Sequence, residues 1–102
     1  MRRVVITGLG IISSIGNNAD EVTESLRQGK SGITFSDEYQ FYGFRSQVYA
    51  KPEIKLEEYV DKRQLRFMGD GAAFNYIAMK QAIEDSGLED CNISNERTGL
   101  IM

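Results

Sequence analysis

The first candidate for chemistry in this sequence is a pair of glycines, Gly8 and Gly10, which follow an apolar run near the N-terminus. After a buried strand, this spacing opens the G-x-G-x-x-G motif, in which a backbone turn holds a pyrophosphate. The third position of the motif is Ser13, however, and the next helix is predicted only after Asn18. The N-terminus of that helix could not meet a phosphate at the glycines. We interpret the glycines as points where the backbone turns or passes close to another element, and a nucleotide-binding βα unit stays as an alternative.

The second candidate is Cys91, the single cysteine of a chain that has no histidine. Without histidine there is no Ser-His-Asp, Cys-His or histidine-metal chemistry. One cysteine forms neither an internal disulfide nor a cysteine zinc cluster. Cys91 follows Glu89 and Asp90, whereas a reactive thiolate needs cationic neighbours or a helix N-terminus. We therefore predict no catalytic residue, no metal site and no cofactor site in this polypeptide.

The third candidate is a basic cluster, Lys62, Arg63 and Arg66, in a chain whose net charge is −3. These residues are spaced i, i+3 and i, i+4, so a basic turn over residues 61–67, capped by Asp61, would present them together. The segment from 45 to 66 has six basic and four acidic residues. From spacing alone, an ordinary solvated face is the simpler explanation, because charge clusters are common on protein surfaces.

Composition restricts the class of protein. A chain of 102 residues with 41% hydrophobic residues is predicted to be globular and to hold one domain at most. No apolar stretch approaches the roughly twenty residues of a membrane helix, and the apolar run after Arg3 is too short for a signal peptide. We therefore expect a cytoplasmic protein with no membrane and no nucleic-acid partner.

Strands and helices must position these candidates. The β-branched apolar run predicts a strand over residues 3–9, buried on both faces of a sheet. A capping-box pattern at Asn18 predicts a helix over residues 19–28. Residues 30–60 are predicted as an irregular loop in which aromatic side chains anchor the chain to a core.

The strongest helix is predicted over residues 71–86, with Asp70 as its N-cap. Its apolar residues cover most of the circumference, so we expect it to be buried on most sides. The apolar residues after Gly99 indicate the start of a second buried strand over residues 98–102. Because natural domain ends are usually polar, this ending suggests a chain cut from a longer protein.

Three blocks of the sequence resemble the opening of the bacterial β-ketoacyl-acyl carrier protein synthases: VVITGLGIISSIGNN at 4–18, SLRQGKSGI at 25–33 and RFMGD at 66–70. The similarity is closer to type I of that family, on the basis of Ser13-Ser14-Ile15-Gly16 and Arg66-Phe67-Met68. It covers essentially the whole chain and is weakest across residues 39–59.

The resemblance implies the N-terminal part of a thiolase-like α/β fold with α/β/α/β/α layers. Such enzymes are several times longer than this chain and act as cytoplasmic homodimers. They catalyse decarboxylative Claisen condensation in fatty-acid chain elongation, using a cysteine nucleophile, two histidines and a lysine. The resemblance places all of these groups beyond Met102 and gives Cys91 no such role. This chain is then expected to be an inactive N-terminal portion.

The resemblance also implies that one functional surface falls inside the chain. It places the residues that dock the acidic acyl carrier protein at Arg45, Lys62, Arg63 and Arg66, and with it we favour docking over an ordinary solvated face. The order Lys62-Arg63 reverses the more usual Arg-Lys, which changes the geometry of a bidentate contact. A stand-alone module that binds an acidic carrier protein without chemistry stays open as a second hypothesis.

Overall fold

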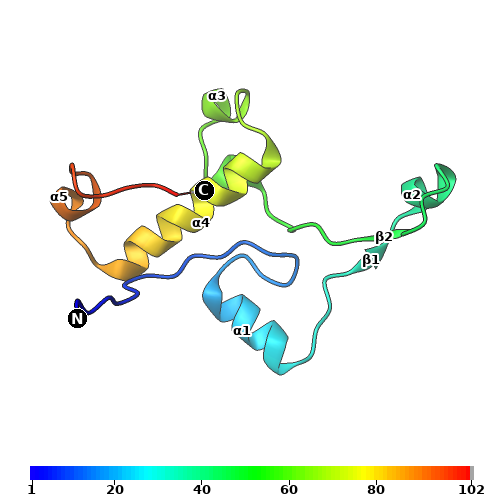
Figure 1. Ribbon diagram of the computed structural model, residues 1–102. Helices are drawn as coiled ribbons and strands as arrows, with labels where there is room; N and C mark the ends of the chain where they lie inside the picture. Colours follow the sequence, from blue (N-terminus) through cyan, green and yellow to red (C-terminus); the bar gives the residue numbers. More distant parts are fainter. Residues whose placement is uncertain (102) are drawn as a thin grey trace.

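The computed structural model describes residues 1–101, with one long helix, α4, at the centre (Figure 1). In chain order the elements are α1 (Ala19–Arg27), β1 (Thr34–Phe35), α2 (Asp37–Phe41), β2 (Val48–Tyr49), the 3-10 helix η1 (Leu56–Glu58), α3 (Lys62–Leu65), α4 (Asp70–Ser86) and α5 (Asp90–Ile93). This mixture of helices with a two-stranded sheet agrees with the predicted α/β class. The layered arrangement stays a prediction.

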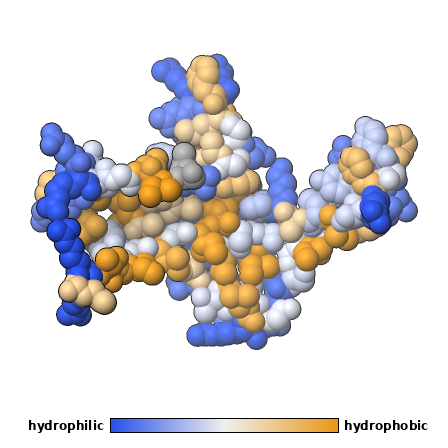
Figure 2. All heavy atoms as spheres, in the orientation of Figure 1, coloured by the Kyte–Doolittle hydropathy of each residue, from blue (hydrophilic) through white to orange (hydrophobic). Residues whose placement is uncertain are grey.

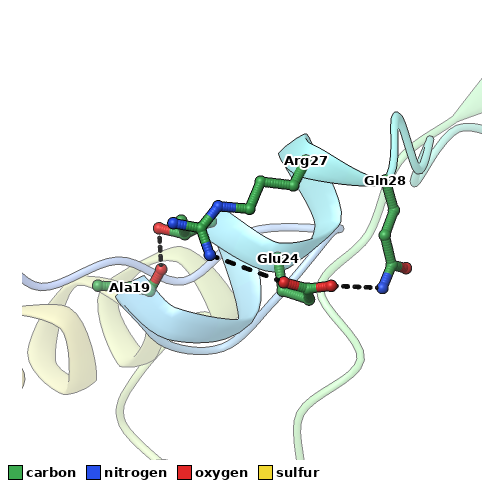
Figure 3. A network of polar contacts seen from close by, with 5 residues as sticks. Ala19, Glu24, Arg27 and Gln28 are labelled. Atoms are coloured by element: carbon green, nitrogen blue, oxygen red, sulfur yellow. Dashed lines mark hydrogen bonds and ion pairs between the residues drawn. The ribbon is translucent and has the colours of Figure 1, made fainter.

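Helix α1 begins where the capping pattern places it. The Asn18 side chain accepts a hydrogen bond from the Glu21 N–H at 2.9 Å, and the acidic first turn suits the positive end of the helix dipole. Further along, Glu24 lies 3.9 Å from the Arg27 guanidinium (Figure 3). The helix predicted over 19–28 runs over Ala19–Arg27 in the structure.

Helix α4 has 17 residues, Asp70–Ser86, where the sequence predicts 71–86. Its N-cap is Gly69 and not Asp70, and no side chain caps it. The Asp70 carboxylate instead lies 3.5 Å from Nζ of Lys51. At the other end Gly87 is the C-cap with φ of 62°, a left-handed conformation that glycine adopts without steric cost.

The predicted strand over residues 3–9 is wrong for the described chain, in which no strand precedes Thr34. A strand needs a neighbour to pair its backbone groups, and within residues 1–101 the only sheet is the antiparallel pair β1–β2. The N-terminal segment instead runs beside α4 (Figure 1). Residues 98–101 of the predicted strand 98–102 form no strand either, and Met102 lies outside the described residues.

The segment predicted as an irregular loop over 30–60 contains β1, α2, β2 and η1. We name residues 34–49 the hairpin arm, because β1, α2 and β2 project together from the rest of the chain (Figure 1). The Ser36 side chain caps α2 by accepting from the Tyr39 N–H at 3.2 Å. The Tyr39 ring packs edge-on against Phe44 at 5.3 Å and Tyr49 at 6.1 Å. These aromatics therefore hold the arm together and do not anchor it to a core.

Little of the described chain is buried. The buried hydrophobic residues are Val60, Ala73 and Ile77. Helix α4 is therefore not buried on most sides, contrary to the prediction. The accessible surface of 8976 Å² compares with about 5,800 Å² for a compact monomer of this mass. The radius of gyration of 17.2 Å compares with about 13 Å for a compact domain of this length.

The exposed apolar surface gathers around α4 and the two end segments (Figure 2). Val4 is 92% exposed, Ile6 93% and Ile101 97%. Residues 3–9 are therefore not buried on both faces, contrary to the prediction, because no strand lies beside them in residues 1–101. Among those residues, no helix has both the length and the hydropathy that crossing a membrane requires.

Candidate functional site

The basic cluster lies on α3 and its C-cap. Asp61 caps α3, and its Oδ1 accepts from the Arg63 N–H at 2.7 Å. Lys62 and Arg63 begin the helix, and Arg66 is the C-cap residue in right-handed helical conformation. The structure therefore brings Lys62, Arg63 and Arg66 together within about one turn, and all three are exposed. We call these three residues the basic turn.

The backbone of the basic turn is supported by contacts with the residues that precede it. η1 packs against α3, and Val60, between these two elements, is only 4% exposed. The Val60 N–H donates to the Leu56 carbonyl at 3.0 Å, and the Leu65 N–H donates to the Asp61 carbonyl at 3.0 Å. The backbone that carries the three cations is thus held by packing and hydrogen bonds within residues 56–66.

The three cations of the basic turn differ in their ion pairing. Nζ of Lys62 lies 3.4 Å from the Glu57 carboxylate. In residues 1–101, Arg63 and Arg66 have no carboxylate within ion-pair distance. Sequence reasoning missed Glu57, because a separation of five residues matches no helical spacing. Its position on η1 is what brings it to α3.

Arg45 lies apart from the basic turn. It is exposed and belongs to the hairpin arm, between Phe44 and β2. The arm and α3 project from different parts of the molecule (Figure 1). The structure therefore brings together three of the four predicted docking residues and leaves the fourth on a separate projection.

The glycine pair faces helix α4. A Cβ at Gly10 would overlap the carbonyl oxygen of Ala78, and a Cβ at Gly8 would overlap that of Ala82. Glycine is therefore required here by the close approach of two backbones.

The amide groups around the glycine pair are already bound to α4. The Leu9 N–H donates to the Asp85 carboxylate at 2.9 Å, and the Ile11 N–H donates to Oε1 of Gln81 at 3.0 Å. A phosphate-binding turn needs such N–H groups for the ligand. The nucleotide-binding alternative gains no support from this geometry.

Cys91 is exposed on the four-residue helix α5, and its Sγ lies 3.7 Å from the Glu89 carboxylate. An acidic neighbour does not favour a reactive thiolate. The described part of the chain holds no cluster of histidine, cysteine or acidic side chains arranged to bind a metal ion.

Comparison with known proteins identifies the family. Residues 1–102 match the family described as Beta-ketoacyl synthase, N-terminal domain. The 3-oxoacyl-[acyl-carrier-protein] synthase 1 of Haemophilus influenzae is 51% identical over 102 residues, which cover 100% of this chain and 25% of that protein. The synthase 1 of Escherichia coli K12 is 48% identical over 102 residues, 99% of this chain and 25% of that protein.

The synthase 2 of Coxiella burnetii is 34% identical over 104 residues, 97% of this chain and 24% of that protein. The identities to the two synthase 1 proteins are higher, which confirms the predicted similarity to type I. The chain spans about a quarter of the length of these relatives. It belongs to the β-ketoacyl synthase family, of which it matches the N-terminal domain.

Proposed function

We propose that this chain serves as the N-terminal part of a condensing enzyme of fatty-acid elongation. The reaction is the decarboxylative Claisen condensation of an acyl thioester with a malonyl group on acyl carrier protein. The observation that carries the proposal is the match of the whole chain to the synthase family, with about half of its residues identical to enzymes named 3-oxoacyl-[acyl-carrier-protein] synthase 1.

We further propose that the chain contributes no catalytic group to this reaction. The condensation needs a thiol nucleophile for the acyl group and further groups that support decarboxylation and attack on the thioester. The chain has no histidine, and its one thiol lies beside Glu89. The catalytic cysteine, histidines and lysine that the resemblance implies are therefore assigned to the rest of the enzyme.

The exposed surface supports a role as part of a larger protein over a stand-alone module. The accessible surface of 8976 Å² exceeds that of a compact monomer by about 3,000 Å². One side of a standard protein–protein interface buries about 800 Å². Such an excess suits a domain interior that the remaining polypeptide covers, in an enzyme that the resemblance implies to be a cytoplasmic homodimer.

The role left to this chain is docking of the acidic acyl carrier protein. The exposed cations of the basic turn, Lys62, Arg63 and Arg66, provide a positive surface within about one helical turn. Such a surface steers an acidic partner and fixes its orientation. Arg45 on the hairpin arm would contact the carrier protein separately.

The test of the enzyme assignment compares a full-length synthase that carries this N-terminal sequence with the 102-residue chain. Both are incubated with acyl- and malonyl-carrier protein, and the 3-oxoacyl-carrier product is measured by mass spectrometry. We expect product from the full-length enzyme and none from the chain alone. A full-length enzyme that forms no product would contradict the proposed reaction, and product from the chain at the full-length rate would contradict the absence of catalytic groups.

A further inference from the structure

The ion pair between Glu57 and Lys62 lies at the edge of the proposed docking surface. Nζ of Lys62 is 3.4 Å from the Glu57 carboxylate, and the two side chains are 78% and 68% exposed. Glu57 reaches Lys62 because η1 packs against α3 and because the buried Val60 fixes the connection between them. The backbone conformation of residues 56–66 therefore brings Glu57 and Lys62 together.

This ion pair contributes little to the stability of the fold. Exposed lysine–carboxylate pairs are screened by water and salt, and fixing two long side chains costs conformational entropy. Glu57 lies on a 3-10 helix of three residues, none of which is buried. Replacing the carboxylate by an amide at this position should leave the backbone unchanged.

The ion pair does alter the charge that an approaching anion meets. Glu57 offsets part of the positive charge of Lys62 that an acidic partner would meet, whereas Arg63 and Arg66 have no carboxylate within ion-pair distance in residues 1–101. A guanidinium also binds a carboxylate or phosphate through two parallel hydrogen bonds, which an ammonium does not. The three cations of the basic turn thus differ in ion pairing and in hydrogen-bonding geometry before any partner binds.

We infer that Glu57 tunes the strength of carrier docking by offsetting the charge of Lys62. Arg63 and Arg66 then make the main contacts with the anionic partner. Lys62 contributes less than the arginines while Glu57 offsets part of its charge. This inference rests on the proposed docking of an acidic carrier protein.

The chain offers a matched control at the next residue. Glu58 lies on the same 3-10 helix and pairs with Lys55 at 3.7 Å, outside the basic turn. Glu58→Gln changes the net charge of the protein by the same unit as Glu57→Gln and leaves the Glu57–Lys62 pair in place. A general electrostatic effect would therefore appear in both variants, whereas loss of the charge offset at Lys62 appears in one.

The experiment measures KM for malonyl-carrier protein in the full-length synthase at low salt, with a small thioester that lacks the carrier as a second substrate. We expect Glu57→Gln to lower KM for the carrier-bound substrate about two- to three-fold, which matches the strength of an exposed ion pair. The gain should vanish in the double variant Glu57→Gln/Lys62→Gln, in Glu58→Gln and with the carrier-free substrate.

Two results separate this inference from the proposed docking itself. If KM for the carrier-bound substrate responds to reversal of Arg63 and Arg66 and is the same in Glu57→Gln and wild type, the tuning by Glu57 is wrong and carrier docking stands. If reversal of the arginines also has no effect, both proposals are wrong. An equal gain in Glu57→Gln and Glu58→Gln would likewise overturn the specific role of Glu57.

Discussion

Gly10 lies so close to the carbonyl oxygen of Ala78 that no side chain fits between them. The same relationship joins Gly8 to Ala82 one turn further along α4. Two glycines that would open a nucleotide-binding motif therefore serve helix packing. The small residues on this face of α4 allow the N-terminal segment to approach the helix backbone.

The first prediction concerns this close approach. Gly10→Ala should destabilise the fold by about 1–3 kcal/mol, because the new methyl group overlaps the α4 backbone and one of the two elements must move. The melting temperature of the full-length synthase measures the effect. Gly71→Ala, in the first turn of α4 with no atom within 4 Å of the added Cβ, should not lower it. Equal melting temperatures for both variants would mean that the segment and helix are less close than the structure shows.

The second prediction concerns Gln81, which holds the N-terminal segment at two points. Its Oε1 accepts from the Ile11 N–H at 3.0 Å, and its Nε2 donates to the Asn17 carbonyl at 2.7 Å. Gln81→Leu leaves both part-buried groups unpaired and should cost about 1–3 kcal/mol. Thermal unfolding of the full-length protein tests this, with the exposed neighbour substitution Lys80→Ala as the control. A stability loss no larger than that of the control would rule out the clamp.

The third prediction concerns the isolated 102-residue chain. Val4 and Ile6 are more than 90% exposed beside α4, and large apolar surfaces of this kind drive association. Analytical ultracentrifugation at micromolar concentration should show species larger than the 11.5 kDa monomer or loss by aggregation. A stable monomer with a cooperative thermal transition would contradict this expectation.

The fourth prediction concerns the single thiol. Cys91→Ser should leave condensation by the full-length enzyme unchanged, because the exposed thiol lies next to Glu89 and makes no contact that a hydroxyl would disrupt. The isolated chain should not be acylated by an acyl-carrier thioester, as intact mass shows. Acylation of Cys91 at the rate of the full-length enzyme would be evidence that it is a nucleophile.

Local signals in the sequence predict helices α1, α3 and α4. Asn18 and Glu21 mark the start of α1, Gly87 marks the end of α4, and Asp61 marks the start of α3. These signals depend only on residues within one turn of each other. Helix α2 was missed because its aromatic residues dominate the segment, although Ser36 followed by two acidic residues is a usable N-cap signal.

Features that depend on distant residues are less predictable from this sequence. The apolar run Val4–Ile6 predicts a buried strand, yet a strand requires a neighbour that residues 1–101 do not provide. The three cations of the basic turn follow from i, i+3 and i, i+4 spacing. The separation of Arg45 on the hairpin arm and the pairing of Glu57 with Lys62 do not, because both depend on how η1 and the arm are placed.

The most direct test of the proposed role of this chain is charge reversal of the basic turn. The triple variant Lys62→Glu/Arg63→Glu/Arg66→Glu of the full-length synthase is assayed with carrier-bound and carrier-free thioesters. The matched control reverses Lys30, Lys80 and Arg97, which are exposed elsewhere and change the net charge equally. We expect KM for the carrier-bound substrate to rise about tenfold in the first variant only, less so at high salt, with the carrier-free reaction unchanged. Equal loss on both substrates would contradict carrier docking and indicate that the basic turn supports the fold.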